Sequence, residues 1–164
     1  MIHKKKINLL ITCAAGIYTS SFKEALDKNP DEYKLFFCDS DFEEINRMKK
    51  RVKKIFWVPN AEEVAADIYL KSILDIFRKN NIDYIIPFSD KEAIFLKNSE
   101  LNHKTIAAEN KLCNECVNKF KLLRFLKDNK ISDTQYFVIN ETKDLSKIEK
   151  LINSSQLCIK PLVG

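Results

Sequence analysis

Apolar and polar positions follow one another in blocks that predict strands separated by helices. Short β-branched runs are typical of buried strands, and longer segments with apolar residues three or four apart are typical of amphipathic helices. The predicted strands are residues 7–13, 33–38, 54–58, 82–87 and 104–108, and the predicted helices are residues 17–28, 40–50, 61–80 and 93–98. Strands joined by helical crossovers form parallel sheets, so the pattern predicts an α/β fold with a doubly wound, Rossmann-like sheet.

Two Ser-x-x-Glu sequences mark points where helices are expected to begin. Ser40 with Glu43, and Ser89 with Glu92, both fit the capping box, in which the serine side chain accepts from the backbone N–H of the glutamate and the glutamate side chain accepts from the backbone N–H of the serine. This gives Glu92 a structural explanation that needs no ligand.

The pattern changes after about residue 110. A helix is predicted for residues 111–129, a strand for 135–139, a helix for 143–153 and a strand for 157–160. We therefore expect a Rossmann-like domain over residues 1–110 and the beginning of a second domain over 111–164. Lys160 stands inside the last apolar strand and Gly164 follows it in a turn, which predicts a longer enzyme that continues beyond this point. The alternative is an exposed lysine on an edge strand.

Composition and charge exclude several functional classes. Hydrophobic residues make up 45% and charged residues 31% of the chain, and the net charge is +5. No apolar run approaches the roughly 20 residues that span a bilayer, and the apolar stretch at residues 7–13 is short for an export signal. The basic run at residues 49–54 joins a helix to a strand and is expected to be a solvated surface. We predict neither a membrane nor a nucleic acid as partner.

The cysteines indicate a reducing compartment, and hence a cytoplasmic protein. Their number is odd, which argues against a disulfide framework: Cys13, Cys38, Cys113, Cys116 and Cys158. The pair Cys113 and Cys116 lacks the second pair, or the histidines, that a zinc site requires. We predict no metal site in this chain.

Candidate binding residues follow two of the predicted strands. Ligands of doubly wound sheets bind beyond the carboxyl ends of the strands, which places Ala15 and Gly16 beside Ser89, Asp90 and Glu92. Free N–H groups in the first turn could hold a carboxylate or a phosphate. The only two glycines are Gly16 and Gly164, so dinucleotide and P-loop fingerprints are both excluded, which disfavours a nicotinamide-dependent enzyme. Asp39 stands where a ribose-binding acid would, and is read as a turn residue.

Six segments, in order, resemble the front half of the ATP-grasp superfamily, most closely its carbamoyl-phosphate-synthase-like members. They are residues 9–16 (first strand and turn), 36–39 (second strand with a terminal Asp), 55–59 (third strand ending in Val-Pro), 85–92 (ending in Asp-x-Glu), 117–120 with Leu126 and Ile131, and 158–161. Asn118 replaces the family's usual Asp, and the first turn has fewer glycines than many relatives. The family's glycine-rich loop, central sheet and Mg²⁺-binding acids would lie after Gly164.

The resemblance implies an ATP-dependent carboxylate–amine ligase in which ATP and Mg²⁺ serve the full-length protein. A carboxylate is phosphorylated to an acyl phosphate, which an amine then attacks. Lys119 and Lys160 would face ATP, whereas Ala15, Gly16, Ser89, Asp90 and Glu92 would form part of the acceptor site. The first domain would be the pre-ATP-grasp domain and the second the start of the ATP-grasp domain.

The 164-residue chain itself is expected to be inactive, since no catalytic residue is assigned within it. Its partners would be small-molecule carboxylate and amine substrates, and unpaired strand edges in the second domain could pair two copies into a homodimer. The alternative is a non-catalytic, Rossmann-like module that binds a small metabolite.

Overall fold

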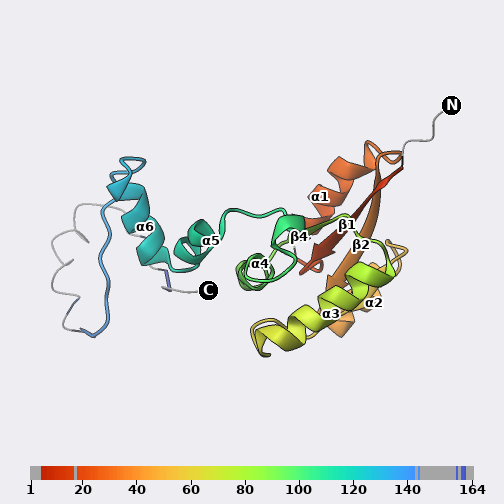
Figure 1. Cartoon of the computed structure of the whole chain (residues 1–164). Helices are drawn as coiled ribbons and strands as arrows, with labels where there is room; N and C mark the ends of the chain where they lie inside the picture. The colour runs from red at the N-terminus through yellow and green to blue at the C-terminus, as the bar shows by residue number, and fades with distance from the viewer. Residues whose placement is uncertain (1–4, 17, 143, 145–157, 159, 162–164) are drawn as a thin grey trace. The chain divides into compact units, whose positions relative to one another are not determined.

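The computed structural model (Figure 1) describes residues 5–16, 18–142, 144, 158, 160 and 161. The chain divides into two compact units, Met1–Cys113 and Asn114–Gly164. The assignment of residues 1–110 and 111–164 to a pre-ATP-grasp and an ATP-grasp domain stays a prediction.

Four parallel strands form the sheet of the first unit, and they confirm the predicted α/β fold. The strands are β1 (Ile7–Thr12), β2 (Tyr33–Asp39), β3 (Ile55–Trp57) and β4 (Tyr84–Pro87), in the spatial order β3-β2-β1-β4. Leu10 of β1 pairs with Phe36 on one side and with Ile85 on the other. From β1 the chain adds β2 and β3 on one side and then β4 on the other side. The point where the strand order reverses therefore lies between β1 and β4.

Helices cover both faces of this sheet, which explains why its strands are continuous apolar runs. They are α1 (Tyr18–Asp27), α2 (Phe42–Met48), α3 (Ala66–Lys79) and α4 (Asp90–Lys97). Figure 1 shows α1 and α3 on opposite sides of the sheet. Alternate strand residues serve the two sides: Leu10 and Phe36 pack with α3 and α4 in the larger core, whereas Ile11 and Phe37 pack with Phe22 of α1 in the smaller one.

The predicted fifth strand, residues 104–108, is wrong. A 3-10 helix, η1 (Asn102–Lys104), occupies its beginning, and what remains is a single parallel bridge between Ile85 and Thr105. The hydroxyl of Thr105 donates to the Leu101 carbonyl at 2.9 Å, and the Ile106 N–H donates to the Ile85 carbonyl at 2.8 Å. Because the Thr105 side chain is bonded to the preceding turn, the segment after η1 pairs with β4 only at the Ile85–Thr105 bridge.

The predicted cap of α2 is also wrong. The N-cap is Asp41, whose Oδ1 accepts hydrogen bonds from the N–H groups of Glu43 and Glu44 at 2.8 and 3.1 Å. Ser40 lies one residue too early, and the charged oxygen of Asp41 is the better acceptor at a helix N-terminus.

Helix α3 begins later than its predicted start at residue 61. The Asn60 carbonyl accepts from the N–H groups of Glu63 and Val64, at 3.0 and 3.2 Å, and its side chain accepts from Glu62. These bonds close a separate turn, and Ala65 is extended before α3 starts at Ala66.

Two short helices replace the single helix predicted for residues 111–129. They are α5 (Asn110–Val117) and α6 (Lys119–Asp128), and Asn118 separates them with extended backbone angles. The Asn118 side chain accepts the Lys121 N–H at 3.1 Å, so this residue is the N-cap of α6. An asparagine offers the backbone this alternative to a continuous helix.

The strands predicted after α6 are not formed by the described residues. Residues 135–139 have no regular secondary structure, although Tyr136 makes an edge contact with Phe120, with ring centroids 5.4 Å apart. Of the predicted strand 157–160, Cys158 and Lys160 are exposed and outside any strand, and the other two residues lie outside the described ones. The helix predicted for 143–153 likewise lies outside them, apart from Asp144. No described helix is long and apolar enough to cross a membrane.

Candidate functional site at the carboxyl edge of the sheet

The two halves of the predicted substrate site meet at the carboxyl ends of β1 and β4. Thr12 is the last residue of β1, and Glu92 lies in the first turn of α4, which follows β4. The Thr12 hydroxyl donates a buried hydrogen bond to Oε2 of Glu92. The turn with Ala15 and Gly16 is therefore held beside the segment with Ser89 and Asp90. A role for these residues in substrate binding stays a prediction.

Glu92 points into the protein and does not complete a capping box. Its side chain bonds Thr12, and the Ser89 hydroxyl makes no capping bond to α4. Only 6% of Glu92 is exposed, and burial raises the pKa of its carboxyl group to about 7. The hydroxyl groups of Thr12 and Tyr69 oppose this shift, while the charges of Asp39 and Glu62 add to it. Near neutral pH this carboxyl group can both give and take a proton.

Tyr69 completes the polar cluster around this hydrogen bond. It comes from α3 and is fully buried, and its hydroxyl lies close to Thr12 and Glu92 without a well-aligned hydrogen bond to either. Burial, followed by the charge of Glu92, raises the pKa of Tyr69 far above its usual range. The cluster of Thr12, Tyr69 and Glu92 thus places a poorly aligned hydroxyl next to a carboxyl group that titrates near neutrality.

The backbone N–H groups expected to bind an anion after β1 are already bonded within the protein. Ala14 donates to the Cys38 carbonyl at 3.1 Å, Ala15 to Oδ2 of Asp39 at 2.7 Å, and Gly16 to the Cys13 carbonyl at 3.3 Å. A Cβ atom at Gly16 would lie 3.3 Å from that same carbonyl oxygen, which is tight. The turn is compact, and Cys13 adopts a left-handed φ of 49° to form it.

Asp39 is the residue that the sequence analysis underestimated. Its carboxylate is 6% exposed and accepts the N–H of Ala15 and, through Oδ1 at 2.9 Å, the N–H of Asp41. It therefore occupies the position that a bound anion would take in front of this turn. A phosphate would have to displace Asp39 or tolerate its charge, so the site favours neutral or cationic groups. The available signal was an aspartate ending the strand next to β1.

The two cysteines of this edge are not activated nucleophiles. Burial raises the pKa of the Cys13 thiol to about 11 and that of Cys38 well above its ordinary value, and the charge of Glu92 adds to both shifts. Both thiols stay protonated at neutral pH, whereas the thiolate is the reactive form.

The two lysines predicted to bind ATP belong to the second unit. Lys119 is the first residue of α6 and is half-buried, and Lys160 is exposed. Their predicted contact with ATP remains a prediction.

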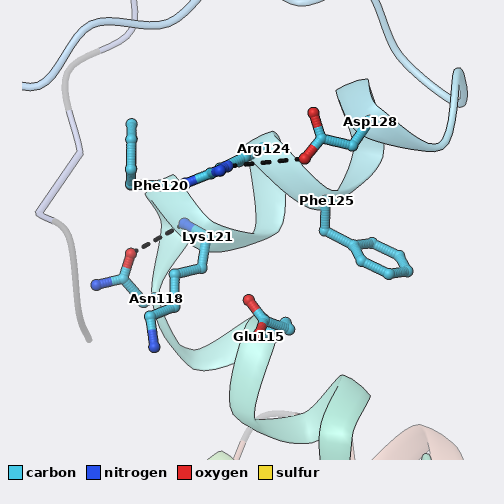
Figure 2. Close-up of a pocket in the computed structure, with 7 residues that line it drawn as sticks. All are labelled: Glu115, Asn118, Phe120, Lys121, Arg124, Phe125 and Asp128. Carbon is cyan, nitrogen blue, oxygen red and sulfur yellow. Dashed lines mark hydrogen bonds and ion pairs between the residues drawn. The ribbon is translucent and has the colours of Figure 1, made fainter.

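Helices α5 and α6 also form a pocket of about 450 Å³ (Figure 2). Its lining carries charges of both signs together with aromatic rings: Glu115, Asn118, Phe120, Lys121, Arg124, Phe125 and Asp128. Nε of Arg124 lies 3.7 Å from Oδ2 of Asp128, which offsets the positive charge. The pocket has no concentrated charge suited to a triphosphate. Across the described part of the chain, no group of three or more His, Cys, Asp or Glu could hold a metal ion.

Comparison with known proteins shows a likeness at the level of fold. No family model matches the sequence, and no curated protein matches it. The structure is similar to that of an L-amino acid ligase from Bacillus licheniformis, with a TM-score of 0.55 and 15% identity, over 92% of this chain and 43% of that one. A dTDP-glucose 4,6-dehydratase (rfbB) from Bacillus anthracis, solved in complex with NAD, aligns over 90% of this chain and 49% of that one. Its TM-score of 0.37 and 12% identity are too low for an argument. The chain spans less than half the length of the ligase.

Proposed function

We propose that this chain is the N-terminal part of an ATP-dependent carboxylate–amine ligase of the ATP-grasp type, similar to carbamoyl-phosphate synthases. The observation that carries the proposal is the fold similarity to an L-amino acid ligase over 92% of the chain. It agrees with the six ATP-grasp-like segments, which occur in the family's order. Ligase activity would belong to a longer protein, one that also contains segments equivalent to the part of the L-amino acid ligase that this chain does not cover.

In this proposal the first unit helps to hold the substrate that accepts the acyl group. Ser89 and Asp90 lie at the start of α4, at the carboxyl edge of the sheet, and Asp90 is exposed. Asp39 makes this edge better suited to an amine than to a phosphate, which supports a role in binding the amine substrate. Glu92 titrates near neutral pH and could take up a proton released by the amine, directly or through water.

ATP would be held by the second unit, where Lys119 and Lys160 supply positive charge suited to phosphate oxygens. Bound Mg²⁺ would neutralise charge on the transferred phosphoryl group. The described residues contain no carboxylate cluster that fits it, so its ligands would come from the rest of the ligase.

The reading frame beyond codon 164 tests this proposal most directly. We expect it to encode a glycine-rich loop and acidic metal ligands, and the corresponding full-length protein to release ADP and phosphate when given a carboxylate and an amine together. A stop codon directly after Gly164 would contradict the proposal and favour a metabolite-binding module. So would a full-length protein that forms no acyl phosphate with any carboxylate tested.

A further inference from the structure

The outer edge of β3 presents unpaired backbone groups. On its inner side, the Lys54 carbonyl accepts the Phe37 N–H at 3.0 Å and the Val58 N–H donates to the Asp39 carbonyl at 2.9 Å. Because backbone groups alternate in direction along a strand, Phe56 bonds toward β2, and the N–H and C=O groups of Ile55 and Trp57 point outward. In the described part of the chain, no hydrogen bond is found for these outward groups.

An exposed aromatic pair lies at the carboxyl end of this edge. Trp57 is 47% and Phe42 62% exposed, and their rings stack with centroids 5.3 Å apart and planes 7° apart. The Trp57 indole N–H donates to the Ser40 carbonyl at 3.1 Å, which fixes the ring. A rigid, exposed aromatic surface next to an open strand edge is typical of an interface.

Charge is distributed unequally along β3. Its carboxyl end lies beside the first turn of α2, where Asp41 and Glu43 are exposed, and its amino end follows exposed Lys53 and Lys54. One end is therefore acidic and aromatic, and the other is basic. An antiparallel copy of the same edge would bring each acidic end against a basic one, so the surface is complementary to itself.

We propose that two copies of this chain pair through their β3 strands, antiparallel about a twofold axis that passes beside Phe56. Ile55 of one copy then faces Trp57 of the other, and these two residues exchange the N–H···O=C bonds that their outward groups lack. The four-stranded sheets become one continuous sheet.

The side chains fit this register. Ile55 and Trp57 lie on the same face of the strand, so Trp57 packs against Ile55 of the second copy. Lys53 of the second copy is the diagonal neighbour on that face, and it reaches the aromatic pair and Glu43. A shift of one residue would leave the outward backbone groups unmatched and turn Ile55 away from Trp57.

Sedimentation of the 164-residue protein tests the proposal. We expect a concentration-dependent dimer that weakens with added salt, and Trp57→Ala should weaken the dimer at least about tenfold. Tyr84→Ala is the matched control, because Tyr84 is an exposed aromatic residue (39%) on the opposite edge strand, β4. Thermal unfolding of each variant shows whether its fold is retained.

Charge reversal tests the polarity of the interface. Lys53→Glu and Glu43→Lys should each weaken the dimer, and the double variant should recover it, because the interaction across the axis is restored with opposite signs. Lys71→Glu, an equal change of charge on the exposed side of α3, should have no effect.

A crosslink tests the register. Phe56 of each copy forms a non-hydrogen-bonded pair, with Cα atoms about 4.5 Å apart, so Phe56→Cys should form a symmetric disulfide under oxidation. Ile55→Cys should form no such disulfide, because Ile55 of one copy faces Trp57 of the other, and the two Ile55 residues lie on opposite sides of the twofold axis. Two results would overturn the proposal. One is a monomer at every concentration, with or without protection of the Ile55 and Trp57 amides from exchange. The other is a dimer that is lost in Tyr84→Ala but kept in Trp57→Ala.

Discussion

Thr12 and Glu92, eighty positions apart in the sequence, form a buried hydrogen bond that joins the end of β1 to the first turn of α4. This bond turns Glu92 away from solvent and away from its expected capping partner, Ser89. The same carboxyl group titrates near neutral pH, since its burial disfavours the charged form. The contact thus fixes the geometry of the candidate site, while burial of the same carboxyl group sets its electrostatics.

Glu92 should make folding stability depend on pH. Its pKa is raised to about 7 in the folded protein, so the folded state holds a proton that the unfolded state has lost. The free energy of unfolding should therefore fall as pH rises from about 4.5 to 7, by about 3 kcal/mol. Glu92→Gln should flatten this slope in urea unfolding measured across that range. Glu24→Gln, at an exposed position of α1, should keep it. A slope equal in wild type and Glu92→Gln would show that Glu92 is ionised in both states.

Removing the Tyr69 hydroxyl should stabilise the protein. The group is buried beside Thr12 and Glu92 without a well-aligned hydrogen bond, and a fully unpaired buried group costs about 1–3 kcal/mol. Tyr69→Phe should therefore raise the free energy of unfolding by about 1 kcal/mol, since some of the cost is already relieved by the nearby carboxyl group. Thermal or urea unfolding measures this, and a clear loss of stability would mean that the hydroxyl is satisfied.

Asp39 should contribute more to the free energy of unfolding than Asp41, the neighbouring N-cap residue. Asp39→Ala leaves the N–H groups of Ala15 and Asp41 without their charged acceptor, which should cost about 3 kcal/mol. Asp41→Ala removes an exposed N-cap and should cost about 1 kcal/mol. Urea unfolding of both variants gives the comparison, and equal losses would show that the turn does not depend on Asp39.

In the proposed full-length ligase, Lys160→Ala should weaken ATP binding with little effect on folding, because the side chain is exposed in this structure. Loss of a charge-assisted hydrogen bond to phosphate corresponds to roughly 1.5–3 kcal/mol, or about ten- to a hundredfold in affinity. Lys119→Ala should act in the same direction but more weakly. Calorimetric titration with ATP measures both, and unchanged affinity in Lys160→Ala would exclude that contact. The 164-residue chain alone should not turn over ATP.

Limited proteolysis should cut the second unit first. Neither α5 nor α6 contains a fully buried residue, whereas the strands of the first unit are packed on both faces. Trypsin should therefore leave a stable fragment that ends near Lys111, identified by mass spectrometry. First cuts within residues 7–87 would contradict this division of stability.

Local patterns in the sequence were sufficient to predict the order of the four strands and four helices along the first unit. Buried parallel strands require continuous apolar runs, and residues 7–13 and 33–38 carry that signal without help from the rest of the chain. The same holds for the amphipathic stripe of α3. Because these signals arise from residues a few positions apart, each can be read on its own.

Tertiary structure decided the features that depend on competition between partners. Glu92 could bond Ser89, three residues before it, or Thr12, at the end of the neighbouring strand. It bonds Thr12, because packing buries these two side chains side by side. Asp39 reads as a turn residue until β1 and β2 pair and bring it to the Ala15 N–H. Thr105 could have extended a fifth strand, but its bond to Leu101 left only one bridge. A local pattern names the groups that need hydrogen bonds, and only the packed sheet determines which partner each of them reaches.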